Sequence, residues 1–311
     1  HKLGFTARRD KPTGEMSCFS RVAPAFTLLG RHGSANIAPH LNIWGFSMSD
    51  ITDQLVVEKS NGLGQILFDN QARRNALTFE MWRDLPLVLN DFAEDDAVRV
   101  VVIGGRGGKA FCAGADISQF KKNRSSEDAV EVYNTTVKVA SDTLANFPKP
   151  TIAKIEGFCI GGGVGIATCC DMRIANDLSS YAVPAAKLGL GYRADGLKRL
   201  VDIVGPTFSK EIFFTARQFT AVEALAMGLV NRIVPRNVLD AYVDDYAQRI
   251  AENAPLTVFA AKTVIDELCR NDGPPDEALC AKVVDDCFDS EDYQEGRTAF
   301  MEKRKAVFPG K

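Results

Sequence analysis

Short apolar segments alternate with segments of helical periodicity from Leu55 onward. The apolar segments have the length of strands, and two of them flank the turn-forming sequence Ser60-Asn61-Gly62, which predicts a hairpin. Apolar residues at helical spacing, with Thr78 as N-cap, predict a helix after the hairpin. The predicted strands lie at 55–57, 64–68, 98–103, 151–155 and 171–175. The predicted helices lie at 78–92, 127–147, 209–214, 221–227, 239–253 and 258–271.

Strands that alternate with helices across glycine turns are typical of parallel βαβ units, so the predicted fold class is α/β. After Gly205 the helical pattern dominates. We therefore expect a mixed core at 48–250 and a helical C-terminal region at 251–311.

The first 47 residues form a separate segment without sustained periodicity. They carry six Lys and Arg residues against two acidic ones. Three interpretations are open: an organellar transit peptide, an upstream extension from a misplaced start codon, or a cloning remnant. We expect a cytoplasmic protein, or a mitochondrial matrix protein if the segment is a genuine transit peptide.

The composition is that of an ordinary globular protein, with 311 residues, 46% hydrophobic, 25% charged and a formal net charge of −3. No run of 18 apolar residues occurs, so no membrane span is expected. Near-neutral charge argues against a nucleic-acid binder. The one basic cluster, at Lys121, Lys122 and Arg124, precedes acidic residues and is explained by a solvated helix face.

Histidines and cysteines limit the available chemistry. All three histidines lie in the first 40 residues, which excludes a Ser-His or Cys-His pair and a histidine-ligated metal from the main body. The eight cysteines show no paired CxxC spacing, so we interpret them as free thiols in a reducing compartment. No metal site is expected, and acid-base chemistry is left to carboxylates, Tyr, Lys, Cys or the backbone.

Two glycine-rich turns, at 109–117 and 157–166, each follow a predicted strand and enter a helix. Small residues at such turns let a ligand approach the backbone, and the free N–H groups of a helix start point toward negative charge. Neither turn has the spacing of a dinucleotide fingerprint or of a phosphate loop.

In this order, the motifs resemble the crotonase superfamily, the enoyl-CoA hydratase/isomerase family, from about Leu55 to Lys311. The matching segments are Arg74-Asn75-Ala76-Leu77, Ala113-Gly114-Ala115-Asp116, Gly161-Gly162-Gly163, Cys170-Asp171, and the tail from Glu295 to Lys305. The resemblance implies a spiral of ββα units with a C-terminal helical trimerisation region, assembled as a homotrimer or a dimer of trimers. It also implies a lyase or isomerase of fatty acid metabolism, with no cofactor beyond the coenzyme A of its substrate.

The resemblance further implies that a thioester enolate is stabilised by an oxyanion hole made of two backbone N–H groups, at Ala115 and Gly162. One such donor is worth about 3 kcal/mol in the transition state. Contacts with acyl-CoA are implied for Arg74, Ala76, Ala113, Asp116, Ile117 and Gly161. Phe300 and Lys303 are implied to reach the adenine end of a neighbouring subunit's ligand, although a solvated helix explains Lys303 equally.

The chain departs from the family at both positions where hydratases carry catalytic glutamates, which are Gly165 and Ala185 here. A positioned general acid or base contributes about 10² to 10⁴ in rate, so ordinary hydration is expected to be badly impaired. Another family position that carries a catalytic aspartate aligns with Arg193, and Asp195 lies two residues later.

The roles around this loop stay open. Asp195 is either a replacement acid or a cap of a helix starting at Gly196. Tyr192 is a candidate donor to a thioester or carboxylate, and Arg193 a candidate partner for an acidic acyl group. Asp116 is explained by capping, and Tyr133 is a further candidate for the pocket wall. The predicted function is therefore an atypical acyl-CoA enzyme, with a decarboxylase, an isomerase using Asp195 and a non-catalytic acyl-CoA binder as alternatives.

Overall fold

The computed structural model describes residues 50–116, 118, 126–270 and 272–311. The described residues belong to one compact unit. The predicted extension at 1–47 lies outside the described residues, as does Ile117. Among the described residues, no helix has the length and apolar character needed to cross a bilayer.

Two sheets organise this unit, and neighbouring strands are parallel except for the pairs β1/β2 and β8/β9. The first sheet has the order β1-β2-β3-β5-β7-β10, with strands Leu55–Ser60, Leu63–Phe68, Val100–Gly105, Thr151–Ile155, Met172–Asn176 and Arg232–Val234. The second has the order β4-β6-β8-β9, with strands Ala110–Cys112, Phe158–Ile160, Ser180–Ala182 and Phe219–Thr220.

The chain passes from the first sheet to the second and then into a helix three times, which is the ββα repeat that was predicted. Helices α3, α4 and α5 close the three units, and α1 follows the initial hairpin. The helices are α1 Phe79–Glu94, α3 Glu127–Ala145, α4 Gly162–Cys169, α5 Ala185–Leu188, α6 Ala194–Thr215, α7 Ala221–Ala226, α8 Leu239–Ala251, α9 Pro255–Leu268, α10 Glu277–Phe288 and α11 Glu291–Glu302.

The hairpin and the first helix follow the sequence prediction. Leu55 pairs with Phe68 in antiparallel register, and Asn61 and Gly62 take up the positive φ of the turn. The Thr78 side chain accepts a hydrogen bond from the Met81 N–H and caps α1. The largest buried side chains of the main core include Phe68, Phe92, Phe111 and Phe147.

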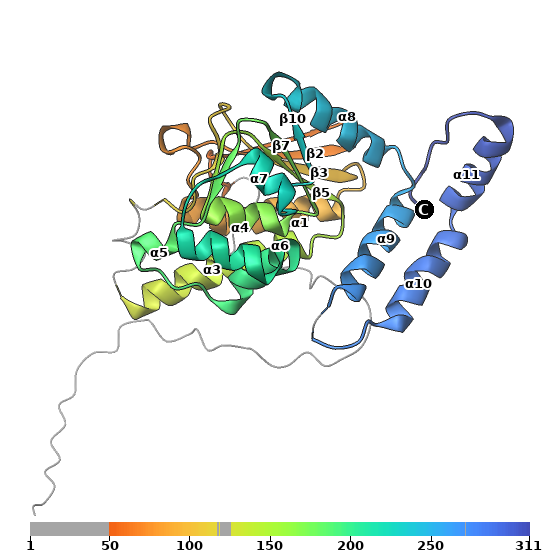
Figure 1. Cartoon of the computed structure of the whole chain (residues 1–311). Helices are drawn as coiled ribbons and strands as arrows, with labels where there is room; N and C mark the ends of the chain where they lie inside the picture. Colours follow the sequence, from red (N-terminus) through yellow and green to blue (C-terminus); the bar gives the residue numbers. More distant parts are fainter. Residues whose placement is uncertain (1–49, 117, 119–125, 271) are drawn as a thin grey trace, which may run out of the picture. The chain divides into compact units, whose positions relative to one another are not determined.

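Helix α6 and the shortest strands differ from the prediction. Helix α6 begins at Ala194 rather than at 209, and Gly205, at φ 73°, kinks it. The strands β4, β6, β8, β9 and β10 were not predicted, because each is only two or three residues long. Figure 1 shows α3, α4 and α6 lying together beneath the sheets, and α9 to α11 at the C-terminal end.

Candidate active site

The first glycine turn is held in place by the loop between β2 and α1. The Leu77 N–H donates to the Gly114 carbonyl at 2.7 Å, and the Asp116 N–H donates to the Leu77 carbonyl at 2.9 Å. Ala115 lies between these two bonds in a parallel bridge with Leu77. Because consecutive N–H groups of an extended chain point to opposite sides, the Ala115 N–H faces away from Leu77. It has no acceptor within the described part of the chain.

Asn75 organises this loop, and the sequence analysis assigned it no role of its own. Its side chain is 1% exposed, and Nδ2 donates to the carbonyls of Arg106 and Ala110 at 3.0 and 2.7 Å. Oδ1 accepts from the Asn70 N–H at 3.1 Å. The available signal was the residue type, because Asn tolerates the left-handed region better than most residues, and Asn75 has a φ of 57°.

Arg74 and Ala76 lie on the same loop. The Arg74 guanidinium lies 4.8 Å from the centre of the Phe158 ring, and the Arg74 carbonyl accepts from the Ala113 N–H at 3.0 Å. The Ala76 carbonyl accepts from Asn70 Nδ2 at 2.8 Å. The loop therefore brings Arg74 and Ala76 next to the turn that contains Ala113 and Ala115.

The second turn enters α4 through Gly161, which has φ 54° and donates its N–H to the Ala182 carbonyl at 2.8 Å. Gly162 is the first helical residue, so its N–H has no partner within the helix. No acceptor for it lies among the residues with described positions. Gly163 must lack a side chain, because a Cβ there would lie 2.3 Å from the Cys112 carbonyl oxygen.

The two turns meet. A Cβ built on Gly162 would lie 3.5 Å from the Ala115 nitrogen, and one built on Gly114 would lie 3.1 Å from the Ile160 carbonyl oxygen. Two backbone N–H groups without acceptors in the described chain, at Ala115 and Gly162, are therefore neighbours. Such a pair can stabilise an oxygen that gains negative charge during a reaction.

Asp116 has structural partners. Its Oδ1 accepts from the Ser118 N–H at 3.0 Å and from the Ser118 hydroxyl at 2.7 Å. Arg73 lies 3.5 Å from its Oδ2. Asp116 is 7% exposed, so these bonds satisfy a largely buried carboxylate. This geometry agrees with a capping role for Asp116.

The two positions of the missing glutamates have different surroundings. Gly165 is exposed on α4, and a Cβ there would meet no atom within 4 Å. Ala185 is 4% exposed and its carbonyl accepts from the Leu190 N–H at 3.0 Å. A longer side chain thus has open space at Gly165, whereas Ala185 is enclosed by the core.

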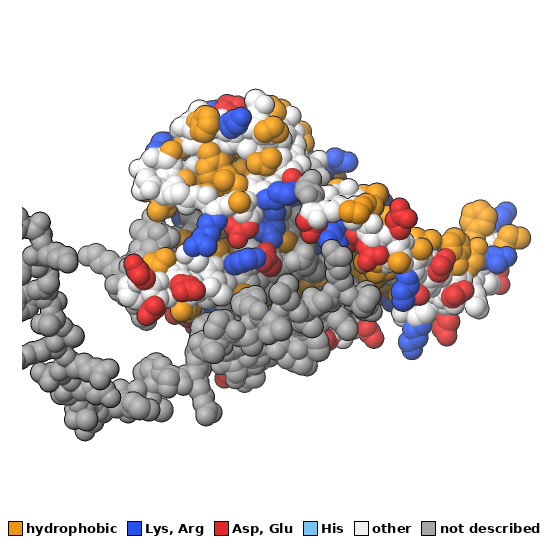
Figure 2. Space-filling model, turned by 90° about the horizontal axis from the view of Figure 1, so that it is seen from below, with side chains coloured by type: hydrophobic (Ala, Val, Ile, Leu, Met, Phe, Trp, Pro, Cys, Tyr) orange, Lys and Arg blue, Asp and Glu red, His pale blue; other side chains and the backbone are white. Residues whose placement is uncertain are grey.

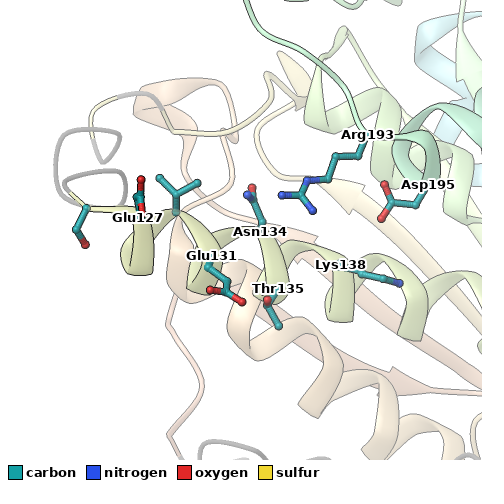
Figure 3. A pocket seen from close by; sticks show the side chains of 9 residues that line it. Glu127, Glu131, Asn134, Thr135, Lys138, Arg193 and Asp195 are labelled. Carbon is teal, nitrogen blue, oxygen red and sulfur yellow. The ribbon is translucent and has the colours of Figure 1, made fainter. Parts of the chain in front are cut away.

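A pocket of about 600 Å³ lies between α3 and the start of α6 (Figure 3). Arg193 and Asp195 both line it, and Figure 3 shows Arg193 extending toward Asn134 of α3. Helix α3 also contributes Glu127 and Glu131, which the sequence analysis did not single out. Their spacing of four residues, which places both on one helix face, was the available signal. Most residues of the described lining have polar side chains, and the lining includes neither Ala115 nor Gly162.

The prediction that Asp195 caps a helix starting at Gly196 is wrong in its position. The N-cap of α6 is Arg193, and Asp195 is the second helical residue, with Oδ1 accepting from the Gly196 N–H at 2.8 Å. Gly196 therefore lies inside the first turn of α6, where a single glycine costs only about 1 kcal/mol, and α6 packs against α4.

Tyr192 and Tyr133 do not line the polar pocket within the described chain. Tyr192 is 40% exposed and packs edge-on against Phe213 at 4.9 Å, and burial raises the pKa of its hydroxyl. Tyr133 belongs to the main hydrophobic core. Both rings therefore support the helices around the pocket.

An ion pair ties the two helices that border this pocket. Arg199 of α6 donates to Asp142 of α3 at 2.7 Å, and Lys138 also donates to Asp142. Burial raises the pKa of Asp142, but the hydrogen bonds from Lys138 and Arg199 outweigh burial and the net pKa is lowered. The pair holds α6 against α3 near the pocket.

The two C-terminal site candidates lie on α11. Phe300 is 82% exposed, and Lys303 is the C-cap, with φ 55°. Exposed apolar side chains are frequent in this region, and Figure 2 shows hydrophobic atoms at the end of the molecule formed by the C-terminal helices. Examples are Ile265, Leu268, Phe288, Phe300 and Met301.

Comparison with known proteins identifies the family. The family described as enoyl-CoA hydratase/isomerase matches residues 58–311. A crotonyl-CoA hydratase of Syntrophomonas wolfei is 34% identical over 259 residues, covering 83% of this chain and 99% of that protein. The human enoyl-CoA hydratase domain-containing protein 2, mitochondrial, is 33% identical over 267 residues, covering 85% of this chain and 91% of that protein.

Among solved structures, an enoyl-CoA hydratase from Bacillus anthracis superposes with a TM-score of 0.78 at 29% identity, covering 83% of this chain and 100% of that one. This likeness and the ββα repeat confirm the predicted crotonase fold. The match also confirms the predicted family, and with it an enzyme that acts on acyl-CoA. The chain belongs to the enoyl-CoA hydratase/isomerase family.

Proposed function

We propose that this protein binds an acyl-CoA and stabilises its thioester enolate with the N–H groups of Ala115 and Gly162. One observation carries the proposal, which is that the two glycine turns bring these N–H groups together, with a Gly162 Cβ position 3.5 Å from the Ala115 nitrogen. As negative charge develops on the thioester oxygen, both donors gain in strength, so they lower the barrier rather than only binding the substrate.

The reaction we propose departs from ordinary hydration. Hydration needs a positioned acid and base to add water, and neither Gly165 nor Ala185 has an ionisable side chain. Asp195 and Arg193 are the candidate replacements, since they share one pocket. A base at Asp195 would permit isomerisation by moving a proton between two carbons of the acyl group.

Decarboxylation is the second candidate, and Arg193 favours it. Its guanidinium lines the pocket and has no ion-pair partner in the described chain, so it is free to bind a carboxylate on the acyl group. Loss of CO₂ leaves its electron pair on the adjacent carbon and generates the enolate without a base. The oxyanion donors would then be sufficient to stabilise the product of bond cleavage.

A panel of thioesters tests these alternatives: crotonyl-CoA for hydration, a 3-enoyl-CoA for isomerisation and malonyl-CoA for decarboxylation. We expect weak hydration and faster turnover in one of the other two assays. Loss of isomerisation in Asp195→Ala, or of decarboxylation in Arg193→Ala, would assign the residue. Tight thioester binding without any turnover would instead establish a non-catalytic acyl-CoA binder, and fast wild-type hydration would contradict the argument from the missing glutamates.

Assembly and location are also proposals. We propose a homotrimer or a dimer of trimers, in which Phe300 and Lys303 contact the ligand of a neighbouring subunit, supported by the exposed apolar side chains of α9 to α11. The remaining motif positions, at Arg74, Ala76, Ala113, Asp116, Ile117 and Gly161, are proposed to contact the acyl-CoA. The protein is proposed to act in the cytoplasm, or in the mitochondrial matrix if residues 1–47 direct import.

A further inference from the structure

Helix α4 carries the Gly162 donor at its first residue, and a buried arginine lies at the opposite end of the same helix. Arg173 is the second residue of β7, the strand that follows α4, and it is 5% exposed. Its Nη1 donates to the carbonyl of Cys170, the C-cap of α4, at 2.8 Å and to the Ala167 carbonyl at 3.5 Å. The guanidinium therefore caps the C-terminal end of the helix whose first N–H is the proposed oxyanion donor.

Arg173 forms no ion pair with a carboxylate of the described residues. Its Nε donates to the Leu229 carbonyl at 2.8 Å, so the hydrogen bonds of its guanidinium in the described chain all go to backbone carbonyls. Asp171, two residues earlier, instead accepts from Lys262 Nζ at 2.8 Å and from the Thr151 N–H at 2.7 Å. The positive charge of Arg173 is therefore not neutralised by a neighbouring carboxylate.

This charge lies in an energetically unfavourable place. Burial disfavours the charged form and lowers the pKa of the Arg173 guanidinium. Arginine nevertheless stays protonated at neutral pH, because its ordinary pKa lies far above the neutral range. The carbonyls satisfy its N–H groups, but they leave the charge itself uncompensated. An unpaired buried charge opposes folding, so its presence points to a role besides stability.

The geometry of α4 suggests that role. The helix has eight residues and is about 12 Å long. Its peptide dipoles place about half a positive elementary charge at the N-terminal end and about half a negative one at the C-terminal end. A cation at the C-terminal end cancels the negative pole. At about 15 Å and an effective dielectric constant of about 20, a unit charge changes the equilibrium that forms an anion about sixfold.

We propose that Arg173 is a positioning residue of the oxyanion hole, which acts through α4 on the anion bound by the Gly162 N–H. Its charge offsets the negative end of the helix, and its hydrogen bonds hold the last turn of α4 against β7. Arg173 stabilises the charged enolate more than the neutral thioester, because only the charge that develops responds to a distant cation. This inference rests on the proposed function, since it concerns the enolate oxygen that Ala115 and Gly162 bind there.

Acetoacetyl-CoA bound to the full chain measures this effect without turnover, because its enolate has an ultraviolet absorption band that the keto form lacks. The measured quantity is the ratio of enolate to keto form of the bound ligand at a fixed pH. We expect Arg173→Gln to lower this ratio about three- to tenfold, as the loss of one unit charge at that distance predicts. Arg173→Lys keeps the charge and should keep the wild-type ratio. A fall in Arg173→Lys as large as in Arg173→Gln would overturn the electrostatic role.

Arg99→Gln is the matched control. Within the described chain the Arg99 guanidinium also donates only to backbone carbonyls, those of Ala251 at 3.3 Å and Phe308 at 2.6 Å. Ala251 is the last residue of α8, a helix that carries no proposed donor. This variant should lose stability but keep the enolate ratio. An equal fall in the Arg99 and Arg173 variants, or no fall in Arg173→Gln, would refute the proposal.

A second pair of variants changes the charge while the guanidinium stays in place, which covers the case that Arg173→Gln does not fold. Cys170 is 4% exposed, and its thiol lies close enough to Arg173 to interact with it electrostatically. Cys170→Asp pairs a carboxylate with Arg173 and neutralises it, so we expect the same three- to tenfold fall in the enolate ratio. Cys170→Asn has equal size and no charge, and should keep the wild-type ratio. Equal ratios in these two variants would contradict the proposal.

Ligand binding and Gly162→Pro separate this inference from the proposed function. If the wild type does not bind acetoacetyl-CoA, the proposed function fails and the role of Arg173 fails with it. If acetoacetyl-CoA binds and Gly162→Pro lowers the enolate ratio while Arg173→Gln does not, the oxyanion hole stands and only the role of Arg173 is excluded.

Discussion

At the level of single residues, each glycine of the second turn has its own physical reason. Gly161 takes φ 54°, and Gly163 lies against the Cys112 carbonyl. Gly162 is different, because its Cβ position has only ordinary contacts, the nearest at 3.5 Å. Its proposed importance therefore lies in its N–H group and not in its lack of a side chain.

This difference permits a clean deletion of one donor. Gly162→Pro removes the N–H at the first position of α4, where proline is well tolerated. Because one oxyanion donor is worth about 2.7 to 4 kcal/mol, we expect kcat on the best thioester of the panel to fall about 10² to 10³-fold. Gly162→Ala adds a Cβ and keeps the N–H, so comparing the two variants separates the effect of an added side-chain carbon from the replacement of the N–H by the proline ring. Equal rates for Pro and Ala would exclude this N–H from catalysis.

A second experiment introduces the two carboxylates that hydratases of the family carry at the positions of Gly165 and Ala185. We expect the double variant Gly165→Glu/Ala185→Glu to hydrate crotonyl-CoA about 10² to 10⁴-fold faster than the wild type, since that is the usual contribution of a positioned acid or base. Gly165→Glu alone should fold normally, because the site is open. The control is Gly165→Gln/Ala185→Gln, whose side chains have similar size and no charge. If it hydrates crotonyl-CoA as fast as the Glu variant, the missing carboxylates do not explain impaired hydration.

At the level of elements, the polar pocket depends on how α3 and α6 are held together. The Arg199 to Asp142 bond joins them at 2.7 Å, and the net pKa of Asp142 lies below its ordinary value. A carboxylate whose folded pKa is lowered stabilises the fold above its unfolded pKa of about 3.9, and the stabilisation is lost as pH falls through the folded pKa.

Chemical unfolding of Asp142→Asn as a function of pH tests the direction of this pH dependence. We expect the variant to lose up to about 1 kcal/mol at pH 7, because the pair is partly exposed and screened. The difference from the wild type should shrink below about pH 4 as the wild-type carboxylate becomes protonated. Asp202→Asn, which removes the exposed partner of Lys198 within α6, serves as the control. If the difference in free energy of unfolding between wild type and variant grows on acidification, the Asp142 carboxylate does not stabilise the fold in its charged form.

At the level of the whole molecule, the proposed assembly makes each site depend on two chains. Gly162 would act on the ligand of its own subunit, and Lys303 on the ligand of a neighbour. Neither Gly162→Pro nor Lys303→Ala alone would then have an intact site. In a symmetric ring of mixed subunits, about a quarter of the sites would combine one intact Gly162 with one intact Lys303.

Mixing the two variants after dissociation and reassembly tests this arrangement. We expect partial recovery of thioester turnover in the mixture, with sedimentation velocity reporting the assembled species. Mixing Gly162→Pro with Ala115→Pro, whose defects would lie in the same subunit, should give no recovery. Recovery in that control pair, or a wild type that sediments as a monomer, would contradict the proposed assembly.

Much of the fold follows from local sequence, because the interactions that decide it are local. The Ser60-Asn61-Gly62 turn specifies the hairpin. The Thr78 side chain caps α1 by accepting a hydrogen bond from the N–H of Met81, three residues later. The strand at Thr151–Ile155 was predicted with its exact bounds. The β9 and β10 strands are stable only through pairing with β8 and β7, so their short sequences carry little signal.

The sequence by itself determined the family, because several motifs occur in the family's order between about Leu55 and Lys311. The two candidate donors come from that resemblance, not from the glycine spacing alone. Only the tertiary structure decided which distant residues meet. It placed Asn75 against the Arg106 and Ala110 carbonyls, and it brought Glu131 of α3 to the pocket of Arg193. These are contacts between segments tens of residues apart, whose geometry depends on the packing of the whole core rather than on any local propensity.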